Sequence, residues 1–211
     1  MLRSGPRRSL ENVEITVVHA ANHFLFEHDS VEDPVSLFER VSELAFVVLI
    51  GAMLLAPINH NGRVLRRAAI SALVSAGLAL MTGAVIARLV DRQRPFVAHP
   101  SAVHLFTPHA ADSGFPSDHA TASFAIAAAI FGFDKRLGAV VLVVATLISI
   151  GRVAIGVHYP SDVIAGALLG CAAALVCARP AIQRYTDDFA DRLGALLARI
   201  SARASAAIHS A

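Results

Sequence analysis

Long uncharged stretches recur along this 211-residue chain. Five of them contain no Asp, Glu, Lys or Arg and are rich in small and aliphatic residues: 44–58, 68–87, 120–133, 137–151 and 163–178. About 20 mostly apolar residues are needed to cross a bilayer, and polar ends can reach the headgroups by snorkelling. Only 68–87 meets this length by itself, so the other four need flanking residues. The pattern predicts five membrane-spanning helices.

Two further segments are amphipathic rather than uniformly apolar. The uncharged core of residues 12–28 is short and contains His19, Asn22 and His23. It is either a poor first span, which would make six, or a helix lying in the membrane interface. Residues 181–211 alternate Ala and Leu with Arg, which predicts an amphipathic C-terminal tail on the inner membrane surface.

The composition supports a membrane protein. Hydrophobic residues make up 55% of the chain and charged residues 16%, whereas a soluble domain carries about 25% charge. The same values exclude a disordered chain and a disulfide scaffold. A net charge of +2 is too small for a protein that binds nucleic acid by neutralising phosphates. We expect an all-α, polytopic membrane bundle of five or six helices, forming one domain over residues 1–211.

The basic residues predict the orientation of this bundle. Thirteen of the 18 would share one side of a six-span arrangement: Arg3, Arg7, Arg8, Arg63, Arg66, Arg67, Lys135, Arg136, Arg179, Arg184, Arg192, Arg199 and Arg203. The positive-inside rule makes that side cytoplasmic. Residues 1–11 would then be a cytoplasmic N-terminal segment and the acidic segment 27–43 would lie outside. The other basic residues, of which all but Arg40 belong to the motifs below, break the rule and indicate chemistry.

The first motif is rich in arginine. Arg88, Arg92 and Arg94 lie within seven residues and are followed by Pro95, which ends the helix. Guanidinium groups bind phosphate oxygens in pairs, so this segment predicts an anion site. Alone, it also fits arginines that snorkel at a membrane boundary.

The second motif is Phe115-Pro116-Ser117-Asp118-His119, which opens the fourth span. A helix N-terminus offers free N–H groups to a phosphate, and Ser117 adds a hydroxyl. His119 lies about one turn inside, where an imidazole can protonate a leaving oxygen. Alone, the motif also fits a capped helix start.

The third motif covers residues 151–162 and contains Arg152, His158 and Asp162. The four-residue spacing of His158 and Asp162 allows the carboxylate to accept from one ring nitrogen and leave the other as a nucleophile. A turn with an Asp at the helix N-cap is the alternative. Together, the three motifs supply the cations, nucleophile and proton donor that phosphoryl transfer needs.

As a set, these motifs resemble the type 2 phosphatidic acid phosphatase superfamily. Its pattern is Lys-x6-Arg-Pro, then Pro-Ser-Gly-His, then Ser-Arg-x5-His-x3-Asp. The matching segments here are 94–95, 116–119 and 151–162. Asp118, together with the segments 94–99 and 108–112, is similar to the bacitracin-resistance subgroup, which are undecaprenyl-diphosphate phosphatases.

The chain departs from the superfamily pattern at three positions. Ala87 stands where the pattern has Lys, so that either Arg88 or Arg92 would take its role. Asp118 replaces the Gly of the second part, and Gly151 replaces the Ser of the third. No role for Asp118 follows from the resemblance.

The resemblance implies a division of labour within the site. His158 would attack the terminal phosphorus and form a phosphohistidine, with Asp162 orienting it. His119 would protonate the leaving lipid phosphate and later activate water. The residues implied to hold the phosphate oxygens are Arg94, Arg152, Ser117 and either Arg88 or Arg92. The superfamily mechanism requires neither metal nor cofactor.

The resulting expectation is an integral-membrane phosphatase in the bacterial cytoplasmic (inner) membrane, with its site facing outside. Its substrate would be undecaprenyl diphosphate, and its products undecaprenyl phosphate and inorganic phosphate. This activity would recycle the cell-wall carrier lipid and confer bacitracin resistance. Two alternatives stay open: a phosphatase of phosphatidate, phosphatidylglycerol phosphate or a shorter isoprenoid diphosphate, and a non-catalytic lipid-diphosphate binder or transporter.

Two observations near the motifs also bear on the site. His99, His104 and His109 share the outer loop, and their five-residue spacing fits substrate or surface roles better than metal binding. Glu43 lies near the outer end of its span, where it either contacts the site or snorkels. The sequence predicts no oligomeric state.

Overall fold

The computed structural model describes residues 6–106 and 108–209, and these ranges form helices and no strands. The helices are α1 (Pro6–Glu27), α2 (Asp29–Leu54), α3 (His60–Val90), α4 (Pro95–Ala98), α5 (Asp118–Phe133), α6 (Lys135–Ala154), α7 (Pro160–Cys177) and α8 (Pro180–His209). The all-α prediction is therefore confirmed. The five expected spans coincide with α2, α3, α5, α6 and α7, except that residues 55–58 follow the end of α2 and residue 178 follows the end of α7.

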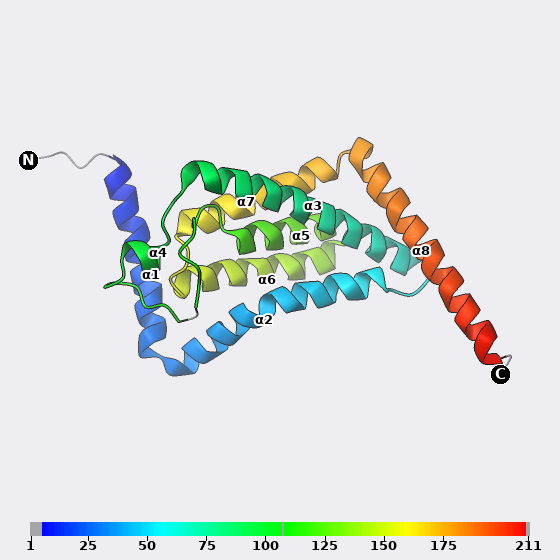
Figure 1. The fold of residues 1–211 in the computed structure, drawn as a ribbon, viewed down its shortest axis with the longest axis horizontal. Coiled ribbons are helices and arrows are strands. Elements are labelled where there is room, and N and C mark those ends of the chain that lie inside the picture. Colours follow the sequence, from blue (N-terminus) through cyan, green and yellow to red (C-terminus); the bar gives the residue numbers. More distant parts are fainter. Residues whose placement is uncertain (1–5, 107, 210–211) are drawn as a thin grey trace, which may run out of the picture.

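Figure 1 shows these five long helices side by side, with α1 and α8 at opposite ends. The chain runs up and down through the bundle, so that α3 and α6 end, and α5 and α7 begin, at the α1 end. This end, together with the loop 91–117, is called the site end below. Within the described residues, α3, α6 and α7 are long and apolar enough to cross a membrane. Helix α5 is apolar but shorter, at 16 residues.

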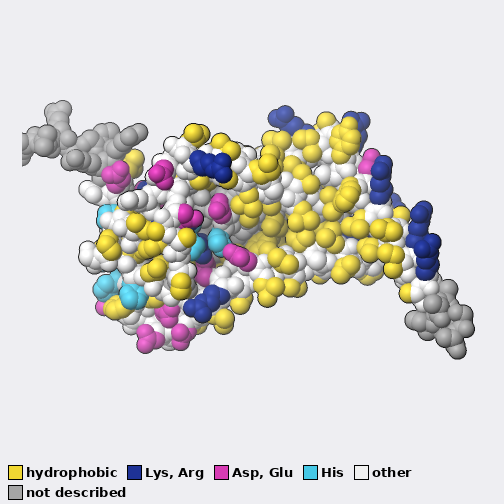
Figure 2. Space-filling view, in the orientation of Figure 1, with side chains coloured by type: hydrophobic (Ala, Val, Ile, Leu, Met, Phe, Trp, Pro, Cys, Tyr) yellow, Lys and Arg dark blue, Asp and Glu magenta, His cyan; other side chains and the backbone are white. Residues whose placement is uncertain are grey.

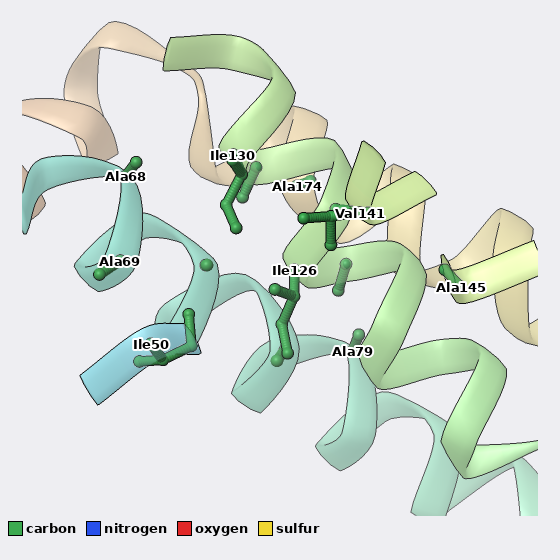
Figure 3. Packing of buried hydrophobic residues seen from close by; sticks show 14 of the residues in the cluster. Ile50, Ala68, Ala69, Ala79, Ile126, Ile130, Val141, Ala145 and Ala174 are labelled. Carbon is green, nitrogen blue, oxygen red and sulfur yellow. The ribbon is translucent and has the colours of Figure 1, made fainter. Parts of the chain in front are cut away.

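Helix α5 lies at the centre and packs against α3, α6 and α7. Small residues make the close approach possible: Ala68, Ala69 and Ala79 of α3 are buried against Ile126 and Ile130 of α5 (Figure 3). On the other side, a side chain at Gly170 of α7 would collide with the backbone of α5. Small residues at helix contacts let van der Waals packing hold a membrane bundle, where lipid tails provide no hydrophobic drive.

Helix α1 does not cross the bundle but lies across its site end (Figure 1). The Asn22 amide donates to the carbonyls of His104 and Ala154, and its oxygen accepts from the His104 N–H. Of the two interpretations of residues 12–28, the spanning helix is therefore wrong. A 12-residue apolar core is too short to span, and its polar residues bind the loops instead.

This position of α1 also corrects the predicted topology. Residues 6–11 begin the helix that covers the site end, whereas they were expected on the opposite, cytoplasmic side. The first five residues lie outside the described ranges. The basic groups that begin α3 and α6 and those on α8 still share the other end. The asymmetry that the positive-inside rule uses is thus preserved between the two ends of the five long helices.

Helix α8 forms where an amphipathic tail was predicted. It packs against the first half of α3, where Arg67 donates to Asp191 and lies 3.4 Å from Asp187. Its other face carries exposed Tyr185, Phe189 and Leu196. Contact with the membrane surface stays a prediction.

Candidate active site

The three motifs meet at the site end. Five of the eight predicted site residues are at most 5% exposed there, namely Arg94, Ser117, Arg152, His158 and Asp162. Figure 2 shows histidines and acidic side chains gathered at this end beside a hollow, apolar side chains over the middle, and Lys and Arg at the α8 end. Buried charge at the edge of a membrane bundle is costly and is usually functional.

His158 lies in the short connection between α6 and α7 with both ring nitrogens engaged. Nδ1 is 2.9 Å from the carbonyl oxygen of Gly114, and Nε2 is 3.0 Å from Nη1 of Arg94. A carbonyl can only accept and a guanidinium can only donate. The proton therefore resides on Nδ1, and the Nε2 lone pair faces Arg94.

Burial lowers the pKa of His158; Asp162 opposes this, while Arg94 and Arg152 lower it further. The ring is consequently neutral at neutral pH. A neutral imidazole with a free Nε2 lone pair is the form that can attack phosphorus.

Asp162 contacts His158 less directly than its spacing predicts. Its Oδ2 is 3.7 Å from Nδ1, beyond hydrogen-bond range, and instead accepts from the Tyr159 N–H at 2.7 Å. The Gly114 carbonyl thus takes the proton-fixing role that the spacing assigned to Asp162. The carboxylate still lies close enough to stabilise a positive charge on the ring.

Arg92, one of the two options for the superfamily's Lys, is bonded to three side chains of the protein. It donates to Asp162 at 2.7 Å, to Ser161 at 2.6 Å and to Glu14 of α1 at 2.6 Å. Glu14 also accepts from the Ser161 N–H at the start of α7. This network ties α1 and the loop after α3 to the helix that carries Asp162.

Arg94 is held at the centre by the loop 91–117 and the α6–α7 connection. Its Nε donates to Asp112 at 2.9 Å, and its Nη1 also donates to the Val157 carbonyl at 3.2 Å. Although burial opposes it, the hydrogen bond from Arg94 holds the pKa of Asp112 below its ordinary value. The guanidinium is thereby aimed at Nε2 of His158.

Arg152, at the end of α6, meets a carboxylate that no motif indicated. Its Nη1 is 3.4 Å from Oε2 of Glu39 in α2, which is itself 5% exposed. The other oxygen of Glu39 occupies the place where a side chain on Gly151 would project. In this chain, Glu39 fills the space that the superfamily's Ser would take.

His109 contacts Arg152 from the outer loop, with Nε2 3.3 Å from Nη2. Burial and the charges of Arg94 and Arg152 lower the pKa of His109 to about 4. His109 is therefore a neutral acceptor at pH 7. Its place in the site could not be read from the spacing of the loop histidines.

His119 lies in the first turn of α5 and contacts Glu43 of α2, with Nε2 2.7 Å from Oε1. Beside this pair is a cavity of about 300 Å³ between α2, α3, α5 and α6. Its lining below the pair is largely apolar, with Phe46, Leu80 and Ile126. Of the two options for Glu43, contact with the site is correct.

The remaining predicted residues are placed differently. Ser117 caps α5, where its hydroxyl accepts weakly from the Ala120 N–H at 3.5 Å, and its own N–H donates to the Asp162 carbonyl. Arg88 is exposed in the last turn of α3, away from these hydrogen bonds. Which of Arg88 and Arg92 would take the role of the superfamily's Lys stays a prediction.

A helical membrane bundle with an imidazole and two guanidinium groups converging at one end defines a site for a phosphorylated lipid. The chain belongs to the PAP2 superfamily, whose model matches residues 68–184. Undecaprenyl-diphosphatase BcrC of Bacillus subtilis is 35% identical over 151 residues, which is 70% of this chain and 74% of that protein. Bacitracin transport permease protein BcrC of Bacillus licheniformis is 41% identical over 106 residues, covering 50% of this chain and 52% of that one.

Solved structures share the fold at lower sequence identity. Aquifex aeolicus LpxE superposes with a TM-score of 0.63 at 21% identity, covering 78% of this chain and 93% of that one. A transmembrane PAP2 type phosphatidylglycerolphosphate phosphatase from Bacillus subtilis gives 0.58 at 20% identity, covering 80% and 84%. With its apolar helices, the chain is an all-helical membrane protein of the phosphatase fold.

Proposed function

We propose that this protein hydrolyses undecaprenyl diphosphate to undecaprenyl phosphate and inorganic phosphate. The names of two relatives, undecaprenyl-diphosphatase BcrC and putative undecaprenyl-diphosphatase YbjG of Escherichia coli, support this substrate. The observation that carries the chemistry is the buried His158, whose Nε2 lone pair faces Arg94 while Nδ1 is held by Gly114.

In the first step, Nε2 of His158 attacks the terminal phosphorus and the bond to the bridging oxygen breaks. The departing undecaprenyl phosphate takes a proton from His119, and a phosphohistidine forms. In the second step, His119 removes a proton from water, which attacks the phosphorus and releases phosphate from His158. The carboxylate of Asp162 stabilises the positive charge that the ring gains.

Two arginines supply the charge that the transferring group requires. Arg94 would exchange its contact with Nε2 for a phosphate oxygen when His158 attacks. Arg152 has a buried Nε that makes no hydrogen bond within the described residues, so it can donate to a second oxygen. Preorganised donors of this kind stabilise the transition state by several kcal/mol (about 3 each). Ser117 and the N-terminus of α5 would add further donors.

The cavity beside His119 suits the lipid chain. It is lined by Leu80, Ala122 and Ile148 and leads from the polar site end into the bundle. A polyprenyl substrate would place its diphosphate at the arginines and its first isoprene units along this lining.

The charge asymmetry supports a cytoplasmic α8 end and a site end that faces outside the cytoplasmic membrane. Carrier lipid released during wall synthesis would then be recycled there, and the activity would confer bacitracin resistance.

The deciding experiment uses the purified protein in detergent with undecaprenyl diphosphate and a chelator. We expect release of one phosphate per lipid, and His158→Ala should lower it at least about 10⁴-fold, because no nucleophile replaces the ring. His104→Ala, which changes an exposed histidine of the outer loop, is the matched control. Activity that survives His158→Ala, or that requires an added divalent metal, would refute the mechanism.

A substrate panel tests the lipid itself. The panel consists of undecaprenyl diphosphate, phosphatidate, phosphatidylglycerol phosphate and farnesyl diphosphate. We expect the highest kcat/KM for undecaprenyl diphosphate. A preference for another member would replace the substrate while retaining the chemistry. Binding without any phosphate release would instead indicate a lipid-diphosphate binder or transporter.

A further inference from the structure

Helix α2 brings two carboxylates to the site. Glu39 and Glu43 are four residues apart and therefore project from the same face of the helix. Glu39 contacts Arg152 and Glu43 contacts His119. Helix α2 lies outside residues 68–184, the segment that the superfamily model matches. These carboxylates thus lie outside the segment that carries the matched motifs.

The contact between Glu43 and His119 is short and specific. Oε1 of Glu43 lies 2.7 Å from Nε2 of His119, which is the distance of a charge-assisted hydrogen bond. Glu39 cannot serve the same purpose, because it is committed to Arg152. Among the described residues, the carboxylate that forms an ion pair with His119 is that of Glu43 and not that of Asp118, its neighbour in sequence.

We propose that Glu43 is a positioning residue that holds His119 in the orientation and protonation state of a general acid. The proposal rests on the function proposed above and deepens it. Accepting the Nε2–H bond directs the ring and favours its protonated form. Nδ1 is then the nitrogen from which the leaving group takes its proton.

The protons balance over both steps. As the bond between phosphorus and the leaving oxygen breaks, that oxygen takes the Nδ1 proton and His119 becomes neutral, with Nε2–H still bound to Glu43. Water then gives a proton to Nδ1 as its oxygen bonds to phosphorus and the bond to His158 breaks. His119 ends protonated, and Glu43 has remained ionised throughout.

The charged groups around His119 act on its protonation in opposite directions. Arg152 of α6 opposes it with positive charge, His158 of the α6–α7 connection is neutral, and Glu43 favours it. Asp118 on α5 contributes a further negative charge nearby. The side chains of α3 that line the adjoining cavity are apolar, so Glu43 is the anion in contact with the ring.

Leaving-group dependence provides the test. A general acid matters most when the leaving group is a poor one, so its loss should harm phenyl phosphate more than 4-nitrophenyl phosphate. The measurement is the rate of leaving-group release after rapid mixing. Glu43→Gln should lower this rate about 20-fold with phenyl phosphate and less than about 3-fold with 4-nitrophenyl phosphate. Hydrolysis of undecaprenyl diphosphate expels a phosphate monoester, a better leaving group than phenolate, so it should slow only about 3-fold, with KM changed less than about 2-fold. The alkaline limb of the pH–rate profile should move to lower pH.

Two further variants distinguish positioning from structure. Glu43→Asp retains the carboxylate and should recover most of the rate with phenyl phosphate. Asp33→Asn removes an exposed charge from the same helix and should leave all rates unchanged. Equal slowing of every substrate by Glu43→Gln, or no slowing, would overturn the proposal. Failure of the unmodified protein to hydrolyse undecaprenyl diphosphate would instead refute the proposed function, independently of the ratio between the two aryl phosphates.

Discussion

The two histidines of the site are held in different ways. His158 is 2% exposed and is held by the carbonyl of Gly114 in the loop 91–117, with Asp162 of its own motif nearby. His119 lies at the mouth of an apolar cavity, and its partner Glu43 comes from a helix 76 residues earlier in the chain. A nucleophile must keep one tautomer and one orientation, and burial ensures both. An acid must reach the leaving lipid, and a more open position allows this.

The site thus has two halves: a nucleophile half around His158, and an acid half around His119. The nucleophile half lies within the matched segment, whereas the acid half depends on a residue of α2. The His158 half is built from the loop 91–117 and the start of α7, which the superfamily model includes. The general acid His119 depends on Glu43, and Arg152 depends on Glu39. Both carboxylates lie on α2, outside the segment that the superfamily model matches. Variation in α2 can therefore alter proton transfer and phosphate binding without changing the nucleophile.

The largest effect among variants that sharpen this contrast is expected from Asp162→Asn. The change removes the negative charge next to His158. The proton stays on Nδ1, where it is donated to the Gly114 carbonyl, so the tautomer is retained. We expect kcat to fall about 10³-fold, less than the 10⁴-fold expected when an Asp alone fixes the tautomer. The measurement is the rate of phosphohistidine formation after rapid mixing with undecaprenyl diphosphate.

The unfolding temperature in detergent is the companion measurement for this variant. Arg92 keeps its bonds to Glu14 and Ser161 when Asp162 is changed, so the helix start should remain folded. A loss of activity below tenfold would show that the Gly114 carbonyl suffices. The nucleophile His158 would then depend on a single fixed contact, just as His119 depends on Glu43.

An intermediate effect is expected from Gly151→Ser, which tests the α2 half. The new side chain would meet the Glu39 carboxylate and displace Arg152. Overpacking of this kind costs about 2 kcal/mol of stability. Because Arg152 is moved from its place beside the phosphate, we expect kcat/KM to fall roughly 30-fold. Adding Glu39→Ala makes room for the Ser, so the double variant should recover most of the loss in a phosphate-release assay.

Gly77→Ser is the matched control, since the same change there meets no neighbouring atom. It should leave kcat/KM within about twofold of the unmodified protein. If the double variant is as impaired as Gly151→Ser alone, Glu39 is not the group that the Ser displaces.

The sequence indicated the local parts of this arrangement and missed the long-range ones. Uncharged runs predicted the five long helices, because membrane spans are encoded by length and hydropathy. The pair of His158 and Asp162 was visible because both lie in one motif, although the Gly114 carbonyl that holds the ring was not. Glu39 was missed because its partner is 113 residues away. The orientation of α1 depends on hydrogen bonds that join Asn22 and Glu14 to residues far away in the sequence. The spacing of apolar residues within α1 cannot predict such contacts.

The smallest effect is expected from His109, which contacts Arg152 from the outer loop. Its pKa is lowered from 6.5 to about 4 in the folded protein, so between these values the unfolded chain binds a proton that the folded chain does not. Stability is therefore lost as the pH falls through this range and is fully present above it. His109→Gln keeps an acceptor for Arg152 without titrating, and it should lose about 2 °C less in unfolding temperature than the unmodified protein between pH 7.5 and pH 5. All other titratable groups are present in both proteins, so their contributions to the change in unfolding temperature cancel when the two proteins are compared. An equal loss in both would place His109 away from Arg152 in solution, and Glu39 of α2 would then be the neighbour that holds this arginine.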